Sequence, residues 1–181
     1  MSTASTGAGR SPSTTGLALR SLLAGLWFGF WFFVAIPGLL LWLSGEDLLP
    51  RPGVSAALGV AVIALAHLAL IREVAGFVRL GRGTHAPFEP PQALLCGGPY
   101  AWVRNPMYLI YVAIVLGEAL VYRSPVLVAW AAALWLLAHL FVVLVEEKAL
   151  LRRFGAAYAD YCERVNRWRP RPPRRQGSGR V

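Results

Sequence analysis

The sequence predicts an all-α integral membrane protein with four transmembrane helices and a cytoplasmic C-terminal amphipathic helix. Hydrophobic residues occupy 56% of the 181 positions, whereas about 45–50% is usual for a soluble domain. They gather into four long runs, and most of the basic residues flank those runs. Both patterns are typical of a chain that crosses a bilayer, and the length fits a single domain.

Four runs approach the roughly 20 apolar residues that a bilayer-crossing helix needs. Pro37 and Gly38 are expected to kink the first run, which membrane helices tolerate, and the second is expected to continue as a helix to residue 80. Only Arg123 and Ser124 separate the short third run from the fourth, so these two should form a tight antiparallel hairpin. The runs cover residues 22–43, 54–71, 107–122 and 125–145.

The distribution of positive charge predicts the orientation of the chain. If both termini face the cytoplasm, the outer loops carry only Arg51 and Arg123, and 16 of the 18 basic residues lie inside. This asymmetry follows the positive-inside rule, and an even number of spans also places both termini on one side. The formal charge of +9 therefore indicates an anionic lipid surface as a partner rather than nucleic acid.

The two ends of the chain differ from the membrane domain, which is expected to cover residues 17–170. Residues 1–16 are rich in Ser, Thr, Gly and Ala, and residues 171–181 are basic, so both tails are expected to be disordered. Prolines within residues 167–175 favour an extended chain whose arginines suit lipid phosphates.

Between the runs and the tails lie a loop and a final helix. Residues 81–100 are rich in Gly and Pro and are expected to be irregular. An apolar face predicts a helix from Glu146 to about Val165 that lies on the membrane or folds back as a lid. Cys96 and Cys162 have no metal-ligand spacing and are interpreted as cytoplasmic thiols without a role. The apolar face consists of Leu150, Phe154, Tyr158, Tyr161 and Val165.

Polar residues gather in two places against these apolar helices. One is the loop ahead of the third run, from Gly98 to Tyr108, and the other is the Glu146–Glu147 pair that leaves the fourth run. Polar groups beside a bilayer are costly and usually serve a function. The hairpin is expected to bring both places together at the cytoplasmic face.

Three separated motifs carry a resemblance to a known family. They occur in order as Gly98-Pro99-Tyr100 with Arg104-Asn105-Pro106-Met107-Tyr108, then Glu146-Glu147, then Phe154-Gly155 with Tyr158, Tyr161 and the closing Arg167-Trp168-Arg169-Pro170. Across residues 81–170 the pattern resembles the isoprenylcysteine carboxyl methyltransferase and phospholipid methyltransferase superfamily. The resemblance implies methyl transfer from S-adenosylmethionine to a lipophilic acceptor, either an isoprenylcysteine-like carboxylate or a phospholipid amine. It also implies a bacterial inner (plasma) membrane, with membrane lipids and a lipophilic substrate as partners and neither nucleic acid nor a metal.

The resemblance also implies roles for individual residues. Arg104 and Glu147 are expected to be catalytic. Arg104 and Asn105 have donors for a carboxylate or an adenine edge, and the two glutamates can accept from ribose hydroxyls or an amino group. His139 lies about two turns before Glu146 and is expected to point to the same side. The expected cofactor-binding residues are Gly98, Pro99, Tyr100, Arg104, Asn105, Pro106, Tyr108, His139, Glu146, Glu147, Tyr158 and Tyr161.

Two residues depart from the family pattern. Asn105 stands where the prenylcysteine enzymes usually carry His, which leaves the methyl acceptor open. Because Asn is familiar in phospholipid methyltransferases, the cofactor role is expected to survive. Ile110 stands where the pattern often has Gly, and its branched side chain is expected to narrow a close helix contact.

Local interpretations also fit several of these residues. Arg104 can anchor the chain in the phosphate layer, and Glu146–Glu147 can be a solvated helix exit. Pro106 fits the first position of a helix with Asn105 as its cap. Aromatic side chains fit an interfacial belt or helix packing, namely Tyr100, Trp102, Tyr108, Tyr158 and Tyr161.

Other classes of protein share part of the pattern. One is an NADPH-dependent reductase of a related membrane fold. A second is a small multidrug-type transporter, for which Glu118 supplies a membrane carboxylate but the Pro-rich loop is left unexplained. If the protein is not a transporter, Glu118 is expected to pair with Arg123 or to extend its carboxylate to the membrane surface. A non-enzymatic assembly factor has no positive sign in the sequence.

Overall fold

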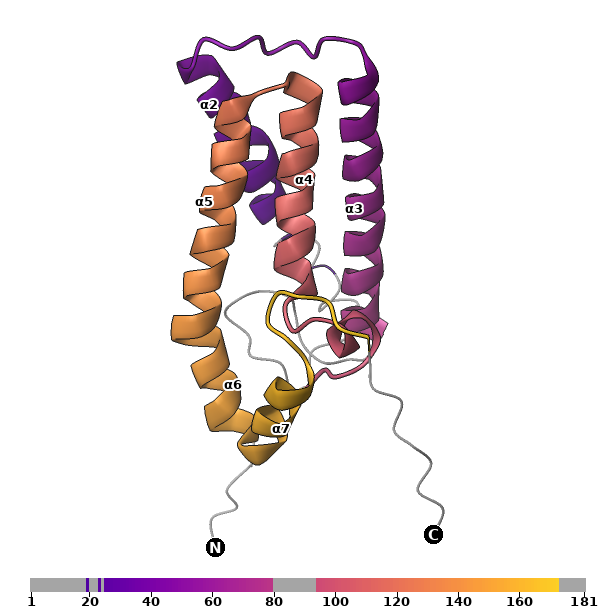
Figure 1. Cartoon of the computed structure of the whole chain (residues 1–181), viewed down its shortest axis with the longest axis vertical. Coiled ribbons are helices and arrows are strands. Elements are labelled where there is room, and N and C mark those ends of the chain that lie inside the picture. The colour runs from indigo at the N-terminus through magenta and orange to yellow at the C-terminus, as the bar shows by residue number, and fades with distance from the viewer. Residues whose placement is uncertain (1–18, 20–22, 24, 80–93, 173–181) are drawn as a thin grey trace, which may run out of the picture.

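The computed structural model describes residues 19, 23, 25–79 and 94–172, and every regular element within them is helical. Figure 1 shows α2 to α5 as neighbouring helices, with α6 and α7 beyond the lower end of α5. The predicted N-terminal tail, most of the predicted C-terminal tail and most of the loop 81–100 lie outside the described residues. The elements in chain order are η1 (Trp31–Ala35), α2 (Ile36–Leu43), α3 (Val54–Arg79), η2 (Gly98–Ala101), α4 (Pro106–Tyr122), α5 (Pro125–Phe141), η3 (Val142–Glu146), α6 (Glu147–Phe154) and α7 (Ala156–Arg164).

Three helical stretches are long and apolar enough to cross a membrane. They are Gly25–Leu43, Val54–Gly76 and Pro125–Phe154. The third predicted span corresponds to α4, an apolar helix of 17 residues. At about 1.5 Å per residue, α4 is about 25 Å long, which is less than a hydrocarbon core of about 30 Å. The membrane class is confirmed, and the crossing of α4 stays a prediction.

Glycines allow α3 and α4 to pack closely. A Cβ atom added to Gly59 would lie 2.5 Å from the carbonyl oxygen of Gly117, and one added to Gly117 would lie 2.6 Å from Cγ1 of Ile63. The Ser55 hydroxyl donates to the Leu120 carbonyl over 2.6 Å, which ties the same two helices together. Small residues at such a contact are typical of membrane helices. The sequence predicts a narrowed helix contact at Ile110, whereas this close contact lies two turns further along α4.

The predicted hairpin between α4 and α5 is confirmed. Arg123 ends α4 in the left-handed conformation with a φ of +52°, and Ser124 follows in an extended conformation. The Ser124 hydroxyl accepts a hydrogen bond from the Leu127 amide over 3.2 Å and so caps α5, which begins at Pro125. Along the hairpin, Val115 of α4 packs against Ala131 of α5 in a buried cluster.

A π turn lies immediately ahead of Pro37, in the run where the sequence predicts a kink. The amide of Ile36 donates to the Trp31 carbonyl, five residues back, instead of the residue four back. Proline has no amide hydrogen, and its ring clashes with the carbonyl four residues before it in a regular α-helix. The wider turn of η1 immediately ahead of Pro37 accommodates this ring without ending the helix.

The single helix predicted from Glu146 to about Val165 is wrong in one respect, because it breaks at Gly155. Gly155 has a φ of +52° and a ψ of −127°, a conformation that only glycine adopts readily. The break divides the segment into α6 and α7. The predicted apolar face is still present, since Tyr158, Tyr161 and Val165 are buried together and pack against Leu94. The segment therefore folds back over the residues ahead of α4.

Candidate active site

Three segments meet at the end of the bundle where α4 begins. The first is the loop of residues 98–105, which contains η2. The second is the Glu146–Glu147 pair at the junction of η3 and α6. The third comprises residues 166–171, which follow α7 and are called the C-terminal segment below. All of the interactions that define the site join two of these segments or join one of them to a neighbouring helix.

Two backbone hydrogen bonds hold the C-terminal segment along the loop. The Arg104 amide donates to the Asn166 carbonyl over 2.9 Å, and the Arg171 amide donates to the Trp102 carbonyl over 2.9 Å. The pairing runs over several residues. The sequence predicts an extended, proline-containing chain here, and this chain lies against the loop of the protein.

Asn105 adds a side-chain contact to the same pairing. Its Nδ2 donates to the Arg167 carbonyl over 3.2 Å, and the residue is 7% exposed. Asn105 occupies the N-cap position of α4, as predicted, but its side chain makes no hydrogen bond to the first turn of that helix. Pro106 does occupy the first helical position, as predicted.

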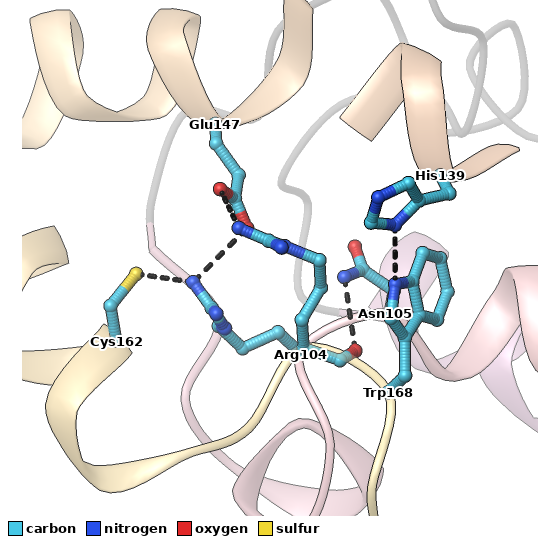
Figure 2. A network of polar contacts seen from close by, with 7 residues as sticks. Arg104, Asn105, His139, Glu147, Cys162 and Trp168 are labelled. Carbon is cyan, nitrogen blue, oxygen red and sulfur yellow. Dashed lines mark hydrogen bonds and ion pairs between the residues drawn. The ribbon is translucent and has the colours of Figure 1, made fainter. Parts of the chain in front are cut away.

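Glu147 is the centre of a charged cluster (Figure 2). Nε of Arg167 donates to its Oε1 over 2.7 Å, and Nη2 of Arg167 donates to its Oε2 over 2.7 Å. Nη1 of Arg104 lies 3.1 Å from the same Oε1. Such bidentate, charge-assisted pairs are among the strong polar contacts in proteins. The hydrogen bonds to Glu147 raise the pKa of the Arg167 guanidinium, so this cation stays charged.

Arg104 has a second partner and a buried donor without one. Its Nη1 donates to Sγ of Cys162 over 2.7 Å, as Figure 2 shows. Its Nε is buried and has no partner within the described residues. With 13% of its side chain exposed, Arg104 does not match the alternative interpretation of an anchor in the lipid phosphates.

Glu146 has a different environment from its neighbour. The Tyr108 hydroxyl donates to its Oε2 over 3.0 Å. Within the part of the chain that the structure describes, none of the ion pairs involves Glu146. Neither glutamate is thus a freely solvated helix exit, although only Glu147 is paired with cations.

The π turn η3 sets the directions of these two carboxylates. The Glu147 amide donates to the Val142 carbonyl, five residues back. A π turn within a long α-helix is frequent at functional sites, because the extra residue per turn redirects the side chains that follow. No sequence signal announced this turn, since no proline or glycine lies within it.

His139 lies against the C-terminal segment. Nε1 of Trp168 donates to its Nδ1 over 2.9 Å (Figure 2), and the Trp135 ring stacks on its imidazole with a centroid distance of 5.5 Å. Because Nδ1 accepts, the proton of a neutral imidazole lies on Nε2. His139 thus joins α5 to the site, as its spacing suggested, but through Trp168.

The two tyrosines of α7 secure the other side of the loop. The Tyr161 hydroxyl donates to the Tyr100 carbonyl over 2.8 Å. Tyr158 and Tyr161 are 5% and 4% exposed, and burial raises the pKa of both hydroxyls, so they remain neutral. The packing interpretation holds for both residues, and contact with a cofactor stays a prediction.

The loop itself is shaped by glycine and proline. Gly98 has a φ of +61°, in the left-handed region that favours glycine, and Pro99 follows it in η2. Trp102 is 48% exposed, which matches an interfacial aromatic side chain. All of the predicted site residues therefore belong to this end of the bundle or contact it.

Three residues of the cluster were not foreseen. The sequence predicts contacts with lipid phosphates for the tail arginines, but Arg167 turns inward to Glu147. The closing motif is the available sequence signal for both Arg167 and Trp168. Cys162 carries no such signal as a lone cysteine, because its contact with Arg104 depends on the fold.

Glu118 lies away from this site, in the half of α4 that ends at Arg123. Its Oε2 is buried without a hydrogen-bond partner in the described chain, and none of the ion pairs found there joins it to Arg123. The Arg123 guanidinium instead lies beside Gly53, where an added Cβ atom would be 2.7 Å from Nη2. The predicted pairing of Glu118 with Arg123 is therefore wrong.

Fold and site together define a small helical membrane protein with a charged cluster at one end of its bundle. The family model described as phospholipid methyltransferase matches residues 54–157, more than half of the chain. The chain therefore belongs to the phospholipid methyltransferase family, and membership implies a membrane methyltransferase. No curated protein and no solved structure matches the chain. Arg167 and Trp168 lie beyond the matched residues.

Proposed function

We propose that the protein transfers a methyl group from S-adenosylmethionine to a lipophilic acceptor at the cytoplasmic face of the membrane. The acceptor is an isoprenylcysteine-like carboxylate or a phospholipid amine. The observation that carries the proposal is the meeting of Arg104, Glu146 and Glu147 at one end of a membrane bundle in a phospholipid methyltransferase chain. A site there is accessible to a polar cofactor from water and to a lipid from the bilayer.

The donors and acceptors present fit this cofactor. The buried, unpartnered Nε of Arg104 is a donor for a carboxylate such as that of the methionine part. The carboxylate of Glu146 has acceptor positions left beside the Tyr108 hydroxyl and can offset the positive charge of the cofactor. The cofactor, when bound, supplies a methyl group on a positively charged sulfur. The task left to the chain is to hold donor and acceptor in line, which accounts for much of the acceleration in such transfers.

The two acceptor classes make different demands on the residues. A carboxylate is already anionic at neutral pH and needs no base. An amine must lose a proton before or during the transfer, and a glutamate within reach can take it. Glu146 suits this role because its described partner is a neutral tyrosine.

The test is calorimetry of the purified protein in detergent, followed by incubation with labelled S-adenosylmethionine and a membrane lipid extract. We expect S-adenosylhomocysteine to bind and a lipid to become labelled, and Arg104→Ala and Glu147→Gln each to weaken binding or transfer at least about tenfold, the factor for about 1.4 kcal/mol. Binding of NADPH without S-adenosylhomocysteine would instead support a reductase. Proton-coupled uptake that Glu118→Gln abolishes, without cofactor binding, would support a transporter.

A further inference from the structure

The two adjacent glutamates differ in how much of their hydrogen-bonding capacity is already used. A carboxylate has about four acceptor positions. At Glu147, three of them are taken by nitrogen atoms of Arg104 and Arg167. At Glu146, one is taken by the Tyr108 hydroxyl. Little capacity is left on Glu147 for a ligand, whereas most of the capacity of Glu146 remains.

The two glutamates also differ in charge balance. Glu147 lies between two guanidinium groups, so its cluster has an excess of positive charge without any ligand. Glu146 has no cation among its partners in the described residues. Removing a charge from a buried pair is costly because the other charge is left uncompensated. A half-buried carboxylate without a cation, such as Glu146, is for the same reason stabilised when a cation arrives.

A second buried carboxyl group, that of Glu73 in α3, lies at the same end of the bundle. Gly59, Ala66 and Glu73 are buried at intervals of seven residues, and Gly59 of this face packs directly on α4. Because α3 and α4 are antiparallel, this face brings Glu73 to the level of the loop ahead of α4. Burial raises the pKa of the Tyr100 hydroxyl, and the charges of Glu73 and Glu146 raise it further. Both carboxylates therefore act on the same region of the loop.

We propose that Glu147 is a positioning residue that holds Arg104 and Arg167, and that Glu146 is the carboxylate that meets the positive charge of the ligand. The inference rests on the proposed function, because that reaction brings an organic cation to the site. The ammonium of the amino-acid part is common to S-adenosylmethionine and S-adenosylhomocysteine and is not the cation assigned to Glu146. The assigned cation is either the sulfonium of S-adenosylmethionine or the ammonium of an amine acceptor. Both carry one positive charge on an alkyl-substituted atom, and the experiment separates them.

The test uses the matched variants Glu146→Gln and Glu147→Gln in the full chain. Calorimetry measures S-adenosylmethionine, which carries the sulfonium, against S-adenosylhomocysteine, which lacks it. If Glu146 meets the sulfonium, Glu146→Gln weakens the first ligand about tenfold more than the second. If it meets the acceptor, both affinities are retained and KM for phosphatidylethanolamine vesicles rises about tenfold. Tenfold corresponds to about 1.4 kcal/mol.

Glu147→Gln has a different expected pattern. Both cofactor affinities fall by the same factor, and the midpoint of thermal unfolding falls because two cations lose their shared partner. The double variant Glu147→Gln with Arg167→Gln removes one charge of each sign and is expected to recover part of that midpoint. This rescue needs no ligand, so it tests the positioning role separately from the proposed function.

Three results would overturn the inference. One is a Glu146→Gln protein with unchanged cofactor selectivity and unchanged KM, and another is an equal loss of both cofactor affinities in that variant. The third is a Glu147→Gln protein that discriminates between the two cofactors as Glu146→Gln does. If the wild-type protein binds neither cofactor, the proposed function fails, and the thermal rescue alone decides the role of Glu147.

Discussion

Single side chains in this site have partners far away in the sequence. Arg104 contacts Cys162, 58 positions along the chain, and Asn105 contacts the Arg167 carbonyl, 62 positions along. The proximity of Arg104 to Glu147 was predictable because a two-residue turn joins the helices that lead to them. The partners of Asn105 and Cys162 were not predictable. Local preferences favour Asn105 as a helix cap, and they give no indication of a partner for Cys162.

Trp168 tests how firmly the C-terminal segment is attached. Trp168→Phe keeps an aromatic ring but removes the donor to His139, and we expect a loss of stability of about 0.5–1.5 kcal/mol. Unfolding of the detergent-solubilised protein, followed by circular dichroism during heating, measures it.

The control for Trp168 is a double-mutant cycle with His139→Leu. If the hydrogen bond is the interaction lost, the double variant is destabilised by less than the sum of the two single changes. Strict additivity of the two changes would show that Trp168 and His139 do not depend on each other.

At the scale of helices, residues with strong local preferences were the predictable ones. Ser124 and Pro125 announced the start of α5, and Pro37 announced an irregularity in the first helix. The break at Gly155 was missed because the apolar face continues across it, although a glycine after a helix is a common stop. The π turn before Glu147 has no such residue, so only tertiary structure reveals it.

The contact between α3 and α4 gives a prediction about their packing. Gly59→Ala would place a Cβ atom 2.5 Å from a carbonyl oxygen of α4, and backbone cannot move aside cheaply. We expect a loss of about 1–3 kcal/mol, typical of an overpacked contact. The measurement is the midpoint of thermal unfolding in detergent.

Gly76→Ala is the matched control in the same helix. An added Cβ atom there has nothing within 4 Å, and alanine favours helix over glycine by about 1 kcal/mol. The control is expected to be neutral or stabilising. A similar loss in both variants would argue against a close α3–α4 contact.

On the scale of the whole molecule, charge predicts an orientation that chemical labelling can test. Cys96 is exposed in the loop that the positive-inside rule places in the cytoplasm, and Leu49 is 82% exposed between α2 and α3. In a protein with Cys162→Ser, a membrane-impermeant maleimide should label Cys96 only after cells are permeabilised. With Cys96→Ser and Leu49→Cys added, intact cells should be labelled. The opposite pattern would invert the predicted topology.

The π turn of η3 acts as a one-residue insertion in an otherwise continuous rod from Pro125 to Phe154. Deleting the exposed Leu144 should therefore leave an ordinary α-helix that still enters the membrane. A π turn winds five residues through about the angle that four residues cover in an α-helix, so the segment beyond the deletion would keep its direction relative to α5. The shortened protein is expected to insert normally and to keep Glu146 beside Tyr108 and Glu147 beside its arginines, with cofactor binding retained. The wide turn would thus absorb the loss of a single codon at this point without displacing a site residue.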